Sequence, residues 1–532
     1  MGCGSIKQLI TAIKNNMSPD AEPGASALRR AFDERGYRKL IPYDRVQNPD
    51  EYRDYELLMQ ALKARKPSDK PRIVVITDVE QDYDDLLAII FLSEMHRLGA
   101  VELAGFVTNH GQPLERAKFL RSIVHLLGLG HIEVARGTIA VASYDASRKF
   151  PQSFYELRNK TFANASWNND PFRDGSDLIE SLARDVDQGK EPLTVLLISC
   201  LKDISDYFDK HKDDPEFIKT HFKKFVSQGG YHIDDTGGGC ELKPNLNAAN
   251  NTWNLPAAEN YTDFLAKHKL PSDAWSREAA KASVLDVGTF TESAGYGPIG
   301  AHMSWVYLRQ EFKFFWDPYN APFMPRLNPE WYLTTRLVLV PGSEKFKDFM
   351  TNPPNFQTVL PETKVIAYDG CAAIGAVGDD VMRSLGIMKP DLVPQYNKQA
   401  HGHRLFGKAF GDLGGIDGER MRHALRTFLL GALKATHEEA EKLIKSADVE
   451  FEVEKYEGVK LGVFLQQAPH LKQARILGQG IKDKDEKAKG ELEQLMKEKL
   501  PSPYEDYPKV PKEIPYELLY EDAMKGIKTI KD

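Results

Sequence analysis

The sequence predicts an α/β fold with an open, mostly parallel central sheet and helices on both faces. Three apolar runs of strand length, at residues 73–77, 101–107 and 132–135, alternate with segments rich in helix-forming residues. The runs are nearly continuous, as is typical of strands that are buried on both faces of a parallel sheet. Strand, helix, strand, helix and strand in this order indicate consecutive βαβ units.

The segments between these strands carry helix signals of their own. Residues 86–92 are apolar, and good helix formers surround them. Pro113 opens the next helix, in which Phe119, Leu120 and Ile123 share one face, and Gly128 is its expected end. Further along the chain we expect strands at residues 193–198 and 364–367 and a long helix at residues 419–434.

The predicted α/β domain spans residues 71–440. The chain has 532 residues, which is too many for one simple core, so extensions or further domains are expected. Residues 1–70 are expected to form a helical N-terminal extension. Residues 441–532 are charged and helical at first and then rich in Pro and Tyr, which indicates an extended C-terminal segment.

Composition argues against several classes of protein. The net charge is −7, and no strongly basic segment favours binding to nucleic acid. No apolar run is long enough to span a membrane, and no charged segment followed by an apolar one opens the sequence, so secretion by a signal peptide is not expected. The four cysteines lack CxxC spacing, which fits a reduced, cytoplasmic protein without a zinc site. Gly2 and Cys3 leave an N-terminal acyl anchor open, although Ile6 stands where the myristoylation signal has Ser or Thr.

The most informative segment is an acidic turn directly after the first predicted strand. Residues 77–85 contain five carboxylates, namely Asp78, Glu80, Asp82, Asp84 and Asp85. In an open parallel sheet, ligands bind in the crevice beyond the carboxyl ends of the strands, where this turn belongs. Carboxylates this close together repel one another unless a hard divalent cation with oxygen ligands binds among them. A solvated acidic turn with an aspartate as helix cap is the simpler alternative.

This turn and several later segments resemble the inosine–uridine-preferring nucleoside hydrolases. That family begins with a strand, Asp-x-Asp-x-x-x-Asp-Asp and a helix, and Asp78, Asp84 and Asp85 fit the pattern. Further similar elements follow in the family's order, up to about residue 376. They are Asn109 after the second strand, segment 196–204 with Ile198 as the expected carbonyl ligand, Gly229-Gly230, the Asn-rich segment 245–254, and Asp369. The resemblance implies an enzyme that hydrolyses the N-glycosidic bond of a ribonucleoside with bound calcium, giving ribose and free base.

The resemblance also implies a role for each of these residues. The expected calcium ligands are Asp78, Glu80, Asp82, Asp85, Ile198 and Asp369, and Glu80 and Asp82 are the two candidates for the general base. The expected contacts to a nucleoside-like substrate are Asp84, Asn109, Asn247, Asn254 and Tyr368. Carboxylates near the ribose would stabilise the positive charge that develops as the bond breaks. Family members are commonly homo-oligomers, so a homo-oligomer is expected.

The sequence departs from the family's pattern at several positions. Glu80 stands in place of the aspartate that is the usual base, and Asp82 stands where the family has Gly. Tyr368 replaces a histidine that assists the departure of the base, and Thr252 replaces an acidic residue of the ribose-binding segment. These changes leave the nucleobase preference open, and Glu80 and Asp82 could share the role of base.

Three alternatives to an ordinary ribonucleoside hydrolase stay open. The same scaffold could act on a modified nucleoside or a pathway intermediate. It could also be a non-catalytic, calcium-stabilised binding protein, which the terminal segments favour. A phosphohydrolase that uses magnesium is the most distant alternative. The residue that protonates the leaving base is also open among His110, His232 and His302.

Overall fold

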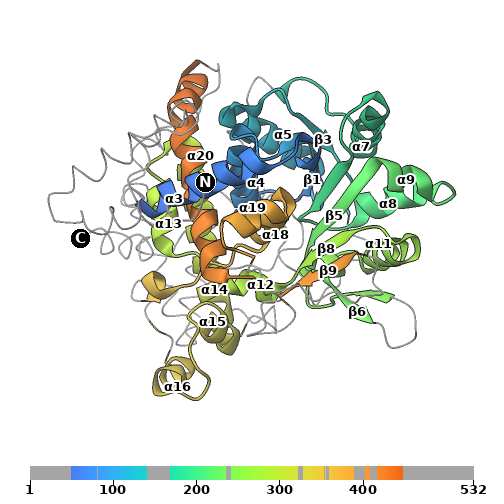
Figure 1. Ribbon diagram of the computed structural model, residues 1–532. Helices are drawn as coiled ribbons and strands as arrows, with labels where there is room; N and C mark the ends of the chain where they lie inside the picture. The colour runs from blue at the N-terminus through green and yellow to red at the C-terminus, as the bar shows by residue number, and fades with distance from the viewer. Residues whose placement is uncertain are drawn as a thin grey trace.

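The fold is an open α/β structure built on a seven-stranded sheet (Figure 1). The computed structural model describes residues 49–80, 82–140, 168–234, 241–320, 328–352, 354, 359–388, 402–407 and 416–446. The strand order is β3-β2-β1-β4-β5-β8-β9, and each neighbouring pair is parallel. The strands are β1 (Arg72–Thr77), β2 (Glu102–Thr108), β3 (Glu133–Arg136), β4 (Leu193–Leu197), β5 (Phe222–Gln228), β8 (Ser272–Trp275) and β9 (His403–Phe406). The predicted parallel sheet is therefore confirmed.

Strand β1 lies in the interior of the sheet because residues 73–76 present apolar side chains to both faces. All six of its residues are buried. Ile73 and Val75 belong to one hydrophobic core, and Val74 and Ile76 belong to the other. Since successive side chains of a strand point to opposite faces, a continuous apolar run can pack against two layers of helices at once. This is why the apolar run at residues 73–77 predicts the strand correctly.

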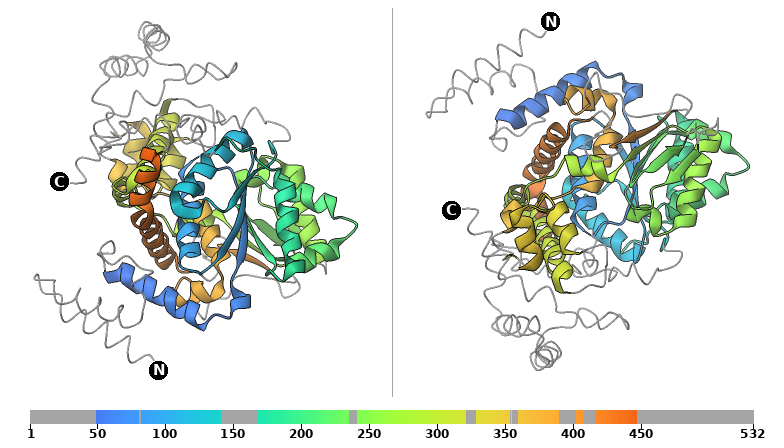
Figure 2. Two further views of the ribbon diagram at one scale, coloured as in Figure 1. Left: turned by 90° about the horizontal axis from the view of Figure 1, so that it is seen from above. Right: turned by 90° about the horizontal axis from the view of Figure 1, so that it is seen from below.

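Helices cover both faces of the sheet (Figure 2). The first core includes α3 (Pro49–Ala64), α4 (Tyr83–Arg97), α5 (Pro113–Val124), α18 (Tyr368–Val377) and α20 (Gly418–Ser446). The second core includes α7 (Gly175–Arg184), α8 (Lys202–Lys210), α9 (Pro215–His221) and α11 (Leu255–His268). Helix α4 packs against α18 and α20, so it is enclosed by the first layer. The predicted helix at residues 419–434 is confirmed within α20.

The remaining elements surround this framework. Further helices of the first core are α12 (Arg277–Ala282), α13 (Val287–Ser293), α14 (Gly297–Asn320), α15 (Pro329–Thr335), α16 (Glu344–Thr351) and α19 (Asp379–Ser384). Strands β6 (Tyr231–Asp234) and β7 (Glu241–Pro244) form a separate antiparallel hairpin, which α10 (Ala249–Thr252) follows. Short 3-10 segments lie at Pro67–Asp69, Asp185–Gln188 and Leu360–Glu362, and one π-helical turn lies at His125–Leu129.

Helix α3 packs into the α/β core although it precedes residue 71. The side chains of Tyr55 and Leu58 are fully buried, and the Tyr55 hydroxyl donates a hydrogen bond of 2.6 Å to Glu94 of α4. Asp54, also buried, forms an ion pair with Arg420 of α20. The described part of the predicted N-terminal extension is therefore helical and shares the core of the neighbouring helices.

Both ends of the chain lie outside the described residues. Gly2 and Cys3 precede residue 49, and all positions after 446 are outside as well, so the predicted acyl anchor and most of the C-terminal segment stay predictions. Helix α20 reaches Ser446, a few residues beyond the predicted end of the α/β domain. Within the described ranges, no helix has the length and apolar character needed to cross a membrane.

The predicted strand at residues 364–367 is wrong. Val365 forms only an isolated antiparallel bridge with Leu285, and α18 begins at Tyr368. Val365, Ile366 and Ala367 are apolar because they are buried in the first core. A short apolar run has the same pattern in a buried connection and in a strand. The last strand of the sheet is instead β9, which pairs with β8.

Candidate functional site

Two helices begin close together at the carboxyl edge of the sheet. Helix α4 follows β1 after the acidic turn; Asp82 is its N-cap residue, and Asp84 and Asp85 lie in its first turn. Asp369 lies in the first turn of α18, which packs against α4. The N-terminus of a helix carries a partial positive charge, which favours carboxylates at these positions.

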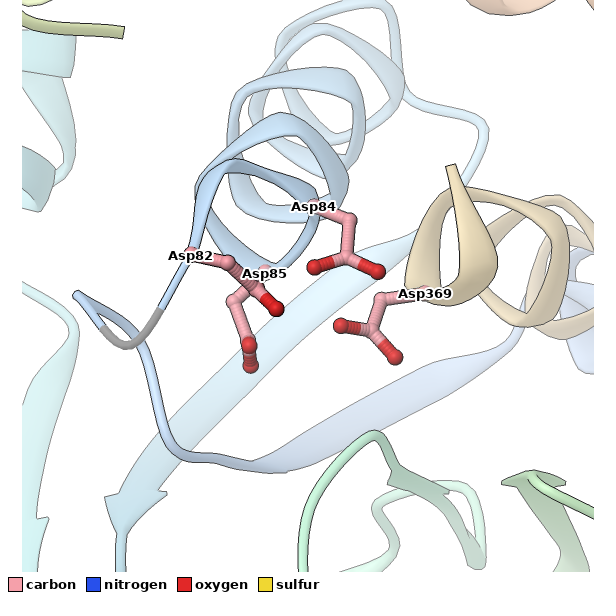
Figure 3. A group of neighbouring side chains, drawn as sticks. All are labelled: Asp82, Asp84, Asp85 and Asp369. Carbon is pink, nitrogen blue, oxygen red and sulfur yellow. The ribbon is translucent and has the colours of Figure 1, made fainter. Parts of the chain in front are cut away.

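The carboxylates of Asp82, Asp84, Asp85 and Asp369 form one cluster, here called the carboxylate cluster (Figure 3). Each offers an oxygen atom, and these four atoms lie within 4.8 Å of one another. The carboxylates of Asp84 and Asp369 point toward one another from α4 and α18 (Figure 3). Asp84, Asp85 and Asp369 are buried, whereas Asp82 is half-buried. The structure thus brings the starts of α4 and α18, which are far apart in the sequence, close together, and all four carboxylates belong to predicted site residues.

The electrostatics of the carboxylate cluster favour a bound cation. Burial raises the pKa of Asp84, Asp85 and Asp369 well above the ordinary aspartate value, and the neighbouring carboxylates raise it further. Without a positive partner, such groups must take up protons to relieve the repulsion. A hard divalent cation that prefers oxygen ligands provides the alternative. The described carboxylates can therefore hold a metal ion, and their donor chemistry fits calcium.

Hydrogen bonds from the protein hold two of the four carboxylates in place. Asp85 accepts hydrogen bonds from the Thr77 hydroxyl and from the Asp78 N–H at 3.2 Å. Asp82 accepts one from the side-chain amide of Gln310 on α14 at 3.3 Å. Groups that orient a carboxylate in this way fix the geometry that it offers to a ligand.

Asp78 and Glu80 lie beside the carboxylate cluster but outside it. The charge of Asp78 raises the pKa of Asp85, so the two residues are close. The Oε2 atom of Glu80 lies 2.9 Å from Nε2 of His302 on α14, and both side chains are buried. Of the two candidate bases, the structure therefore places Asp82 in the cluster and pairs Glu80 with a histidine.

Two of the three predicted asparagines form side-chain hydrogen bonds with the protein. Asn109 donates hydrogen bonds to the Cys200 carbonyl at 2.8 Å and to Asp203 at 2.7 Å. Asn254 caps α11 and donates to the Ala140 carbonyl at 2.8 Å, whereas Asn247 is exposed in a turn. Among the described residues, none of these three side chains forms a hydrogen bond with the carboxylate cluster. Their predicted contact with substrate stays a prediction.

Ile198 and Tyr368 lie near the two segments that form the carboxylate cluster. The Ile198 N–H donates a hydrogen bond of 3.0 Å to the carbonyl of Ile76, so Ile198 follows β4 at the carboxyl edge, beside the end of β1. Tyr368 is the first residue of α18, directly before Asp369, and is half-buried. Their predicted roles stay predictions.

The three candidate histidines have different environments. His302 pairs with Glu80, and His232 is exposed on the β6–β7 hairpin. His110 follows β2, and its ring stacks on Trp253 with 3.5 Å between the ring centroids. Burial lowers the pKa of His110 to about 2, with a further contribution from the nearby Arg116. The imidazole of His110 is therefore neutral near pH 7.

Sequence reasoning missed Arg116 and Gln310. Arg116 lies on α5, is only 1% exposed, and donates hydrogen bonds to backbone carbonyls of the turns after β1 and β2. Its position on the apolar face with Leu120 and Ile123 was a usable signal, because a charged residue on a buried face must have partners. Gln310, on a long helix far along the chain, gave no comparable signal.

A separate cavity of about 620 Å³ lies at the opposite, amino edge of the sheet. It is lined by residues at the starts of β4, β5 and β9 and by α3 and α19, and by none of the predicted site residues. Its charged groups are largely paired with one another: Arg65 with Asp380, and Arg404 with Asp379. We therefore assign the site to the carboxylate cluster and not to this cavity.

Comparison with known proteins places the fold in a structural context. No family model and no curated protein matches the chain. Two solved structures match at 18% identity and a TM-score of 0.56, each over 73% of this chain. They are the effector protein XOO4466, covered over 100% of its length, and the type III effector XopQ complexed with adenosine diphosphate ribose, covered over 99%. The chain has the fold of these effectors.

Nucleoside hydrolases are also among the solved structures that match. A purine-preferring ribonucleoside hydrolase from Gardnerella vaginalis is 16% identical over 68% of this chain and 99% of its own, with a TM-score of 0.39. A similarity this low carries no conclusion about the activity of this chain. The XopQ and XOO4466 comparisons, at 18% identity, support the α/β fold alone.

Proposed function

We propose that this chain hydrolyses the N-glycosidic bond of a ribonucleoside or of a closely related ribose compound in a calcium-dependent reaction. The carboxylate cluster carries the proposal, because it gathers four carboxylates from α4 and α18 at the edge of the sheet where ligands bind. The type of reaction is inferred from the sequence motifs, which resemble those of the nucleoside hydrolases and follow the same order.

The proposed calcium ligands are Asp82, Asp85 and Asp369, with Asp78, Glu80 and the carbonyl of Ile198 as further candidates. The observed basis is that the clustered oxygens all lie within 4.8 Å of one another and that the pKa of the buried aspartates is raised. A bound calcium ion would supply positive charge and a template for the ribose diol and the attacking water.

The remaining residues have proposed roles toward the ribose and the water. Asp82 is the favoured general base, because it is the half-buried member of the cluster and Gln310 orients it. Asp84 would accept hydrogen bonds from ribose hydroxyls and stabilise positive charge on the ring as the C–N bond breaks. Asn109, Asn247, Asn254 and Tyr368 are the other proposed substrate contacts.

A second candidate is a protein that binds or cleaves a larger ribose compound. XopQ, which shares the fold, has been solved with adenosine diphosphate ribose. The engagement of Glu80 by His302 favours a substrate other than an ordinary nucleoside, because the residue at the usual position of the base is turned to a protein partner. Adenosine diphosphate ribose therefore belongs in any substrate panel.

The deciding experiment measures release of reducing sugar from purine and pyrimidine ribonucleosides and from adenosine diphosphate ribose, with calcium and with chelator. Turnover that requires calcium and is lost in Asp85→Asn supports the hydrolase. Binding of adenosine diphosphate ribose without turnover supports the binding protein. A folded protein that shows no turnover, no calcium binding and no binding of adenosine diphosphate ribose would reject both. The expected homo-oligomer is tested separately by light scattering during gel filtration.

A further inference from the structure

Two adjacent turns at the carboxyl edge hold non-glycine residues in left-handed backbone conformations. Glu80, after β1, has a φ of 76°, and His110, after β2, has a φ of 62°. β1 and β2 are neighbours in the sheet. A left-handed conformation is unfavourable for residues with a Cβ atom, so it persists only where the surrounding structure enforces it. Such residues tend to cluster at ligand-binding sites.

The guanidinium of Arg116 bridges these two turns. Its Nη1 donates hydrogen bonds to the carbonyls of Asp78 and of Val79, the latter at 2.7 Å. Its Nε donates a hydrogen bond of 2.8 Å to the carbonyl of His110. Arg116 is 1% exposed. One rigid, planar group therefore contacts the backbone directly before Glu80 and at His110, which is the geometry needed to fix both turns together.

Each of the two turns presents a buried polar atom without a hydrogen-bond partner among the described residues. These atoms are Oε1 of Glu80 and Nδ1 of His110. Glu80 is held through its other oxygen by His302, and His110 is held by its stack on Trp253. A buried polar atom that lacks a partner is unfavourable in the free protein. A ligand with hydroxyl or N–H groups would satisfy such atoms.

We propose that Arg116 is a positioning residue that holds the turns after β1 and β2, so that Glu80 and His110 present unpartnered polar atoms to the ligand. This proposal rests on the function proposed above. The ligand class is a polyhydroxylated or amine-bearing compound, such as a ribose with an attached base. Arg116 acts through the backbone of both turns and not by contact with the reacting atoms.

The test compares Arg116→Lys and Arg116→Gln with Arg72→Lys and Arg72→Gln. Arg72 is a matched control, because it is 3% exposed and donates a hydrogen bond of 2.8 Å to the Leu182 carbonyl, but at the amino end of β1. Lysine keeps the charge and loses the planar fork, so it separates charge from geometry. All variants are first checked by thermal unfolding and assayed well below their Tm.

The kinetic arm uses the panel substrate that the wild-type protein turns over. Arg116→Lys should lower kcat/KM by about 10- to 100-fold, since displacement of site groups by about 1 Å has effects of this size. Arg72→Lys should change kcat/KM by less than about 3-fold even if it lowers Tm equally. Equal losses of kcat/KM in both variants, or no loss in Arg116→Lys, would overturn the proposal.

The structural arm does not depend on turnover and separates this inference from the proposed function. In a crystal structure of Arg116→Gln, Glu80 and His110 should leave the left-handed region, and the stack of His110 on Trp253 should open. If both residues keep a positive φ, the inference is wrong even for an active enzyme. If they move in a protein that hydrolyses no nucleoside, the proposed reaction fails and the positioning of the two turns by Arg116 stands.

Discussion

Oε2 of Glu80 and Nε2 of His302 lie 2.9 Å apart in a pair that is almost completely buried. The pair joins the turn after β1 to α14, across more than two hundred residues of sequence. Glu80 stands at the position where the resemblance implies the general base. Because His302 engages Glu80, we propose Asp82, in the carboxylate cluster, for that role.

We predict that Asp82→Asn lowers kcat more than Glu80→Gln. A general base contributes about 100- to 10,000-fold to the rate, so Asp82→Asn should lose at least about 100-fold, whereas Glu80→Gln should lose about 10-fold. The measurement is kcat at saturating calcium and substrate, with circular dichroism as the control for folding. A larger loss in Glu80→Gln would return the role of base to Glu80.

His302→Ala should destabilise the protein, because it leaves the buried Glu80 carboxylate without its partner. The expected cost is about 1–3 kcal/mol in the free energy of unfolding, measured by urea denaturation. Adding Glu80→Gln to His302→Ala should recover part of this loss, since a neutral amide is less costly to leave unpaired than a carboxylate. An additive effect of the two changes would show that the pair is not coupled.

Asp85→Asn and Asp369→Asn should each abolish calcium-dependent turnover and weaken calcium binding. Each removes one anionic oxygen from the carboxylate cluster, and the loss of rate should be at least about 100-fold. Isothermal calorimetry with calcium gives the binding readout. Asp213→Asn is the control, because it makes the same chemical change at an exposed position in the loop after α8. Unchanged calcium affinity in both cluster variants would move the metal site elsewhere.

Calcium should stabilise the protein more as the pH rises. In the folded protein without a cation, the pKa values of Asp84, Asp85 and Asp369 are raised above the ordinary aspartate value of 3.8. The stability that these groups contribute is therefore present below that value and is lost as the pH rises through the raised pKa values. A cation bound among the ionised carboxylates offsets this loss.

The measurement for this pH dependence is the shift in Tm on adding calcium, between about pH 5 and pH 8. At pH 8 and a calcium concentration of about 100 times Kd, the stabilisation should approach about 2.7 kcal/mol. Sodium chloride at equal ionic strength is the control, because a monovalent salt screens charge without binding tightly among the carboxylates. A shift in Tm that is the same at every pH, or that falls as the pH rises, would contradict the linkage.

Helix α3 should prove essential to the core. Leu58 is fully buried, so Leu58→Ala should lower the free energy of unfolding by about 2–5 kcal/mol. Arg53→Ala on the exposed side of the same helix should change it by less than about 0.5 kcal/mol. Both values come from denaturant unfolding. A small effect of Leu58→Ala would mean that α3 is an appendage to the α/β domain.

The strands β1 to β4 could be predicted from the sequence because each is a local apolar run bounded by polar or turn residues. Strands β8 and β9 could not, since each has only four residues that mix charged with apolar side chains. Strand β3 is equally short and mixed, but it completes the regular alternation of strands and helices that begins at β1. Residues 364–367 were predicted to form a strand and do not, because burial against helices needs the same apolar residues as burial in a sheet.

The sequence by itself determined the alternation of strands and helices and the placement of Asp82, Asp84 and Asp85 after a buried strand, because both follow from local patterns of burial. Only the tertiary structure decided that Asp369 joins them, that Glu80 pairs with His302, and that Arg116 bridges two turns. These contacts join residues far apart in the chain or on separate turns. Their geometry depends on how the helices pack around the sheet, and no local spacing encodes that packing.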